Sequence, residues 1–312
     1  MKHWKKVLLT GLLFGTLALS GCADQSAPAE TLRIGIMPDV ESIPLLIARE
    51  KGYFPECGVG VELITFKSAR DRDSALQGEQ LDGVVSDMAA VAFAHDGGIP
   101  LKITAQTDGN ILLLADEKQG IESVADLKGK EIALSTNTVM EYSLDCMLKE
   151  AGVSPDEVIK TAVPQLPTRL EMLQNGQIPA AILPQPLAGV GVQSGAAVLT
   201  DTQTLGEKAG VIAFTPETLE ERLPLVQAFF AAYDLAVEEL NGAEAGTYDE
   251  FLIQTLDFPE SLRGAMPLPV YKPATLPDAA IFEHVMEWLT DRGLVQQALR
   301  WEDVVFDVES GK

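Results

Sequence analysis

Two carboxylates, Asp39 and Glu41, lie in the short segment "PDVES" between two apolar stretches of the chain. Carboxylates accept hydrogen bonds from amines, amidines and ring N–H groups, and in a low-dielectric site they repel anions. Because the segment follows a predicted strand and precedes a predicted helix, the pair favours a neutral or cationic ligand that carries nitrogen. The alternative is that Asp39 only caps the turn and that Glu41 points into solvent.

Further candidates follow the other predicted strands, and no Lys or Arg falls at those strand ends. Thr107 is considered beside Gln106, and Tyr142, one helical turn beyond Thr138, could form an aromatic wall. The candidate ligand-binding residues are Asp39, Glu41, Ser42, Ser86, Asp87, Met88, Gln106, Thr136, Asn137, Thr138, Tyr142, Gln165 and Gln185.

Each of these candidates also has a structural interpretation. Ser42, Ser86, Asp87 and Thr138 could be helix caps alone, each contributing about 0.5–2 kcal/mol. Tyr142 could be a core residue, and Gln165 and Gln185 could simply be exposed beside prolines. Arg169 would suit an anion, but it lies inside a predicted helix, where a structural ion pair is the favoured reading.

Residues for catalysis or metal binding are scarce. The chain has three His; His3 precedes the folded part, and His95 and His284 do not follow strands. The spacing of Cys57 and Cys146 matches no zinc pattern, and Cys146 falls in an apolar helical pattern that predicts a core position. We expect no catalytic residue, no metal and no cofactor.

Strands and helices alternate along the chain, which is typical of mostly parallel sheets covered by helices on both faces. A first unit is predicted to have strands at 32–37, 60–66, 81–86, 101–107 and 110–116, and a second unit strands at 131–135, 159–164, 179–184 and 196–200. The stretch 210–215 then reads as a strand that returns to the first unit. The rest is predicted helical, at 217–242, 247–256, 278–291 and 293–300.

The first residues differ from the body of the chain. Lys2, Lys5 and Lys6 precede an apolar run at 7–20, which is shorter than a membrane-spanning helix and indicates a secretory signal. The following "LSGC" resembles a bacterial lipobox with lipid on Cys22. An ordinary signal peptide with an incidental Cys is the alternative. The whole chain has 46 Asp and Glu against 23 Lys and Arg. Because binding to nucleic acid phosphates needs basic patches, nucleic acid is not expected as a partner.

The stretches "IPLLIAREKGYF", "ALQGEQLDGVVSD", "VADLKGKEIALS" and "LEMLQNGQIPAAILPQP" resemble solute-binding proteins of bacterial ABC importers. The resemblance is to the nitrate, sulfonate, taurine and thiamine-pyrimidine-precursor branch. It implies a type II periplasmic-binding-protein fold of two α/β lobes joined by two hinge crossings. It also implies transport of a small solute to an ABC permease and its ATPase.

The expected organisation is a signal peptide at 1–21, a tether at 22–30, a first lobe at 31–115 plus 210–312, and a second lobe at 116–209. We expect an extracytoplasmic monomer that touches the membrane through its lipid anchor alone. Three alternatives stay open: binding of a sulfonate- or nitrate-type anion, a surface sensor or scaffold, and an enzyme on the same fold.

Overall fold

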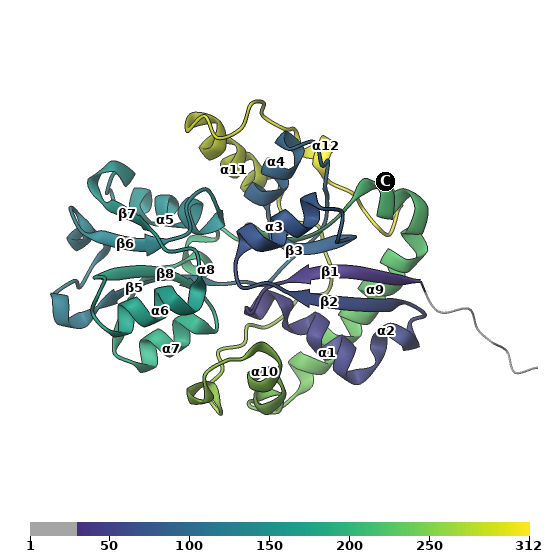
Figure 1. Ribbon diagram of the computed structural model, residues 1–312, viewed down its shortest axis with the longest axis horizontal. Helices are drawn as coiled ribbons and strands as arrows, with labels where there is room; N and C mark the ends of the chain where they lie inside the picture. Colours follow the sequence, from purple (N-terminus) through teal and green to yellow (C-terminus); the bar gives the residue numbers. More distant parts are fainter. Residues whose placement is uncertain (1–29) are drawn as a thin grey trace, which may run out of the picture.

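The computed structural model describes residues 30–312, which form two α/β lobes side by side (Figure 1). Each lobe has a five-stranded sheet with helices on both faces. This confirms the predicted two-lobed fold class. The predicted signal peptide, Cys22 and almost all of the predicted tether lie outside the described residues.

The first lobe has the strand order β2-β1-β3-β10-β4. Helices α3 and α4 cover one face of this sheet, and α1, α2 and α9 cover the other (Figure 1). The strands are β1 (Thr31–Ile36), β2 (Gly60–Thr65), β3 (Gly83–Asp87), β4 (Lys102–Gln106) and β10 (Gly210–Phe214). The helices are α1 (Ile43–Lys51), α2 (Tyr53–Glu56), α3 (Ala69–Gln77), α4 (Met88–Asp96) and α9 (Pro216–Gly242).

The second lobe has the strand order β7-β6-β8-β5-β9, with α5 on one face and α6 and α7 on the other (Figure 1). The strands are β5 (Ile111–Asp116), β6 (Glu131–Leu134), β7 (Ile159–Ala162), β8 (Ala180–Pro184) and β9 (Ala196–Asp201). The helices are α5 (Val139–Glu150), α6 (Leu166–Gln174), α7 (Leu187–Gln193) and α8 (Thr202–Leu205).

One strand in each sheet runs opposite to the other four. β10 is antiparallel to β3 and β4, and β5 is antiparallel to β8 and β9. Each of these strands is the first that the chain forms after crossing between lobes. Since the other strands end at the cleft, a strand that enters from the cleft must run away from it. Open α/β sheets bind ligands at those carboxyl ends.

The strand predicted at 110–116 does not belong to the first lobe, contrary to the sequence-based expectation. β5 pairs with β8 and β9, so it belongs to the second sheet, and the first crossing falls before it. Its apolar sequence predicts a buried strand without indicating which sheet it completes.

The C-terminal region is helical around the first lobe, with α10 (Asp249–Leu256), α11 (Ala279–Asp291) and α12 (Trp301–Val304). A helix predicted at 293–300 is absent: Gly293 has a positive φ of 63°, and no helix follows until α12. Within residues 30–312, no helix combines the length and the apolar character that a membrane crossing requires.

Candidate functional site

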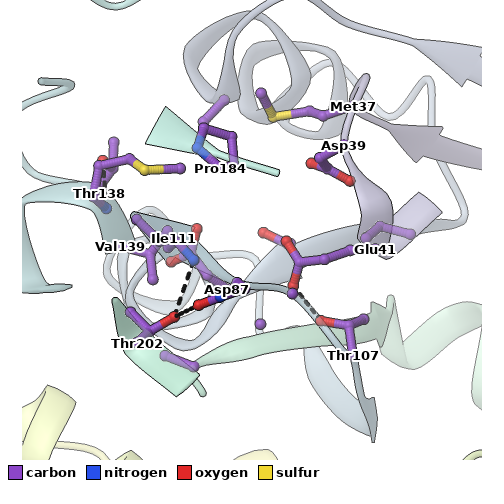
Figure 2. A pocket seen from close by; sticks show the side chains of 18 of the residues that line it. Met37, Asp39, Glu41, Asp87, Thr107, Ile111, Thr138, Val139, Pro184 and Thr202 are labelled. Atoms are coloured by element: carbon purple, nitrogen blue, oxygen red, sulfur yellow. Dashed lines mark hydrogen bonds between the residues drawn. The ribbon is translucent and has the colours of Figure 1, made fainter. Parts of the chain in front are cut away.

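A cavity of about 60 Å³ lies between the lobes, at the carboxyl ends of the strands. Met37, Asp39 and Glu41 form one side of it, and Thr138, Val139 and Pro184 lie across from them (Figure 2). Both lobes and both crossings contribute to its walls. A space of this size holds a few waters or one small molecule.

Asp39 is fixed where β1 ends. It is 7% exposed, and its Oδ1 accepts hydrogen bonds from the backbone N–H and the hydroxyl of Ser42, both at 3.2 Å. Asp39 thus caps the short 3-10 helix that leads into α1, as the structural reading of this turn proposes. Asp39 also lines the cavity, so the same side chain both caps the helix and faces the cavity.

Glu41 lies between the two crossings instead of pointing into solvent. Its carboxylate accepts a hydrogen bond from the Thr107 hydroxyl, just after β4 (Figure 2). It also packs against Gly109 in the first crossing and Gly210 at the start of β10. A Cβ at Gly210 would overlap Glu41 Oε1 and Thr107 Oγ1, so this position requires glycine.

A third carboxylate, Asp87, is the last residue of β3. It is 5% exposed, and its Oδ1 accepts the backbone N–H of Ala90 at 2.9 Å, which caps α4. The neighbouring Ser86 hydroxyl also lines the cavity, and it is buried with no hydrogen-bond partner in the described chain. Such an unsatisfied group is costly unless a ligand or water bonds to it.

Arg72, in the first turn of α3, brings a positive charge to this wall. It is 3% exposed, donates to the Val85 carbonyl at 3.0 Å and pairs with Asp73 at 2.8 Å. No Lys or Arg falls at the candidate strand ends, but Arg72 reaches the cavity wall from inside a helix. The sequence "SARDRDS" places Arg72 inside a helix, and a search confined to strand-end turns misses it.

Burial raises the pKa of all three carboxyls. The pKa of Glu41 rises to about 8 because of burial and then the nearby charge of Asp39, while Thr107 and Arg72 oppose the rise. Burial raises the pKa values of Asp39 and Asp87 to about 6, against the lowering effect of the Arg72 charge. Near neutral pH, Glu41 can therefore hold a proton that a ligand could displace.

The second-lobe wall is less charged. Ser135 at the end of β6, Thr138 at the N-terminus of α5, and Gln185 after β8 all line the cavity. Ser135 was passed over in favour of the three residues that follow it. Gln185 Oε1 accepts the backbone N–H of Gly189 at 3.0 Å, which orients the side chain, and its NH₂ group can donate to a ligand.

Arg169, behind this wall, forms no ion pair within residues 30–312, so its predicted structural ion pair is wrong. It is fully buried and donates to the carbonyls of Val163 and Ile182 and to the Ser135 hydroxyl oxygen, at 3.0, 2.7 and 2.5 Å. Burial alone lowers its pKa to about 9. The apolar helical pattern around Arg169 gave no sign that its partners would all be neutral.

The two lobes touch beside the cavity. The backbone N–H of Val40 in the first lobe donates to the Gln185 carbonyl in the second at 3.1 Å. The two crossings are themselves joined, because the Thr107 N–H donates to the Gly210 carbonyl at 3.1 Å. The two lobes are therefore in direct contact at one edge of the cavity.

Several predicted residues lie away from the cavity. Ser42 and Met88 are fully buried, Gln106 bonds to the Lys208 carbonyl, and the Tyr142 hydroxyl bonds to Glu207. Gln165 precedes α6 and is not among the lining residues. Thr136 and Asn137 are exposed and line an outer groove of about 680 Å³ that adjoins the cavity.

Cys57 and Cys146 are both free and partly buried. Within residues 30–312, no group of three His, Cys, Asp or Glu side chains is placed to hold a metal ion.

The profile of the family described as "NMT1/THI5 like" matches residues 39–241, more than half of the chain and all of the cavity wall except Met37. The chain belongs to this family. The resemblance found in the sequence, to solute-binding proteins of ABC importers, is confirmed.

Two curated relatives differ in their names and in how much of this chain they match. The "Putative aliphatic sulfonates-binding protein" of Bacillus subtilis is 30% identical over 141 residues, which are 41% of this chain and 41% of that protein. The "Putative thiamine biosynthesis protein" of Haemophilus influenzae is 25% identical over 298 residues, 88% of this chain and 90% of that protein. The chain thus spans less than half of the first relative and most of the second.

Solved structures share the fold. The alkanesulfonate-binding protein SsuA of Xanthomonas axonopodis, bound to MOPS, superposes with a TM-score of 0.75 at 19% identity, covering 90% of this chain and all of that one. The desulfurization enzyme DSZB superposes at 0.64 and 15% identity, covering 90% and 98%. At these identities the likeness concerns the fold alone, and both a binding protein and an enzyme share it.

Proposed function

We propose that this chain is the extracytoplasmic solute-binding lipoprotein of an ABC importer, anchored through Cys22 and delivering a small molecule to a permease and its ATPase. The interlobe cavity carries the proposal, because both lobes and both crossings build its walls. A ligand held there contacts both lobes at once and so stabilises the closed arrangement. The relatives named for sulfonate and bicarbonate binding support the transport role.

The proposed ligand is neutral or cationic and carries nitrogen, such as a pyrimidine-like heterocycle or an amine. Burial raises the pKa of three of the carboxyls that line the cavity, Asp39, Glu41 and Asp87. An N–H donor or a cation compensates the buried negative charge, and a charge-assisted hydrogen bond contributes about 1.5–3 kcal/mol. The relative that matches nearly the whole chain is named for thiamine biosynthesis, which agrees with a nitrogen heterocycle.

Binding of an inorganic or sulfonate anion is the second candidate, and Arg72 favours it. Yet Arg72 is already paired with Asp73 and lies in the fields of Asp39 and Asp87. An enzyme is disfavoured because neither His95, which bonds to the Leu101 carbonyl, nor His284, which bonds to Glu207, lines the cavity. A sensor or scaffold role would use the same cavity without a permease.

Two measurements test this function. Native mass spectrometry of the protein purified without unfolding should show a retained small molecule, and its mass identifies the class. Calorimetry at pH 7 in buffers of different ionisation enthalpy then gives the proton linkage. A cation or N–H donor beside Glu41 displaces its proton, so binding should release up to about one proton. Proton uptake, or tight binding of nitrate or a simple sulfonate, would establish the anion alternative.

Two isosteric variants locate the contact. Asp39→Asn and Glu41→Gln keep the shape and remove the charge. At least one variant should bind a cationic or N–H-donating ligand about tenfold more weakly or worse, because it loses the charge-assisted hydrogen bond. A tenfold change in affinity corresponds to roughly 1.4 kcal/mol. The anion alternative predicts tighter binding by Asp39→Asn, because a repelling charge is gone.

A further inference from the structure

The cavity wall opposite Asp39, Glu41 and Asp87 offers neutral hydrogen-bond donors instead of carboxyls. Among the lining residues from β6, α5, α6 and β8 with their adjoining turns, none is acidic. Glu207 also lines the cavity, but it lies at the second crossing and is bonded to Tyr142. A ligand therefore meets carboxyls on the first lobe and neutral donors on the second.

Ser135 is the most constrained of these donors. Its oxygen accepts from Arg169 Nη2 at 2.5 Å, so the hydroxyl proton must be directed elsewhere. The protein acceptor within its reach is the Pro164 carbonyl at 3.5 Å, the limit of hydrogen-bond distance. Because the hydroxyl lines the cavity, an acceptor on a ligand would receive this proton in better geometry.

Arg169 strengthens that donor. Its guanidinium keeps its proton near neutral pH and has only neutral partners within residues 30–312. A buried cation without a carboxylate is costly, and negative charge placed nearby offsets the cost. Through the Ser135 hydroxyl, Arg169 therefore favours an electron-rich oxygen on the far side of the cavity.

We propose that the ligand is dipolar: besides its nitrogen end it carries an acceptor oxygen, a carboxylate or a carbonyl, which binds Ser135. Arg169 is then a positioning residue that orients the hydroxyl. This inference rests on the proposed function and adds the second end of the ligand. An anion alone would face the first-lobe carboxyls unpaired, and an amine alone would leave Ser135 and Arg169 uncompensated.

Matched probes test the oxygen. Cytosine and 4-aminopyrimidine share the ring and the amine, but only cytosine has a carbonyl oxygen. β-Alanine and n-propylamine share the amine and a short chain, but only β-alanine has a carboxylate. By calorimetry at pH 7, the oxygen-bearing member of at least one pair should bind about tenfold tighter or more than its partner.

Variants assign that preference to Ser135. Ser135→Ala should remove most of the tenfold advantage while leaving the partner without oxygen within about twofold. Thr136→Ala, the exposed neighbour, is the matched control and should change neither. Arg169→Met should act like Ser135→Ala if it folds, and Ser135→Ala suffices if it does not.

The proposal is wrong if the two probes of each pair bind equally tightly. It is also wrong if Ser135→Ala weakens the binding of the oxygen-bearing probe and of its partner by the same factor. Failure of all four probes at millimolar concentration also counts against it. The transport role has its own test, because a solute retained in native mass spectrometry would stand whether or not it carries the acceptor oxygen.

Discussion

Arg292 binds two acids that belong to the opposite lobe. It follows α11, which packs on α4 of the first lobe, and it donates to Glu141 Oε1 at 2.6 Å and Asp145 Oδ2 at 3.0 Å on α5. Trp288, one turn earlier, donates to Asp145 Oδ2 at 2.9 Å. Lys160 of the second lobe also pairs with both acids. The lobes are thus tied at a second place, away from the cavity wall.

Arg292→Met should loosen this tie. The acids are almost fully buried but keep Lys160, and Arg292 is about one-third exposed, so we expect a loss of about 1–2 kcal/mol of unfolding free energy. Small-angle scattering of the unliganded variant should show a larger radius of gyration than wild type. Lys149→Met, on the exposed side of α5, is the control. An unchanged profile would mean that the tie does not hold the lobes together.

Glu41 should make the unliganded protein less stable as the pH rises. Its pKa is raised to about 8 in the fold from an ordinary value of 4.5, so the folded state holds a proton that the unfolded state has lost. Stability is then greatest below the unfolded pKa and falls as the pH rises toward 8. Urea unfolding at pH 5.5 and 7.5 should show wild type losing about 2 kcal/mol more than Glu41→Gln.

The exposed acid Glu244 provides the comparison for that experiment, because Glu244→Gln should keep the pH dependence of wild type. Parallel curves for wild type and Glu41→Gln would show that Glu41 does not carry the proton.

Gly210→Ala should disrupt the contact between Glu41 and the crossings. The added methyl would overlap Glu41 Oε1 and Thr107 Oγ1, and overpacking of this kind costs about 1–3 kcal/mol. Adding Glu41→Ala removes one overlapping group, so the double variant should be more stable than the sum of the two single effects. Thermal unfolding of all four proteins gives this coupling. Strict additivity would indicate that the methyl is accommodated elsewhere.

Cys22→Ser should release the protein from the membrane. The lipobox-like "LSGC" predicts that lipid on the Cys22 sulfur is the anchor. Cell fractionation should move the variant to the soluble extracytoplasmic fraction, while Cys57→Ser stays with the membrane. A Cys22→Ser protein that remains on the membrane would contradict lipid anchoring.

The sequence predicts the elements of this fold well, because short apolar runs alternate with helical apolar patterns in both lobes. It fails at β5, since burial on both faces does not reveal which sheet a strand completes. At the site, Asp39, Glu41, Ser86, Asp87, Thr138 and Gln185 line the cavity as strand-end positions suggest. Arg72 was missed because it reaches the cavity from inside a helix, and side-chain reach is not visible in residue spacing.

The position of β10 has a consequence for biosynthesis. The second sheet is built from the contiguous stretch 111–201, whereas β10 separates β3 from β4 in the first sheet. A chain that emerges N-terminus first can pair β2, β1 and β3 early, but β4 has no neighbour until residues 210–214 appear. The lobe that begins first is therefore completed last. In an exported chain the first lobe would therefore stay incomplete until residues 210–214 have been made, whereas the second lobe could fold once residue 201 has appeared.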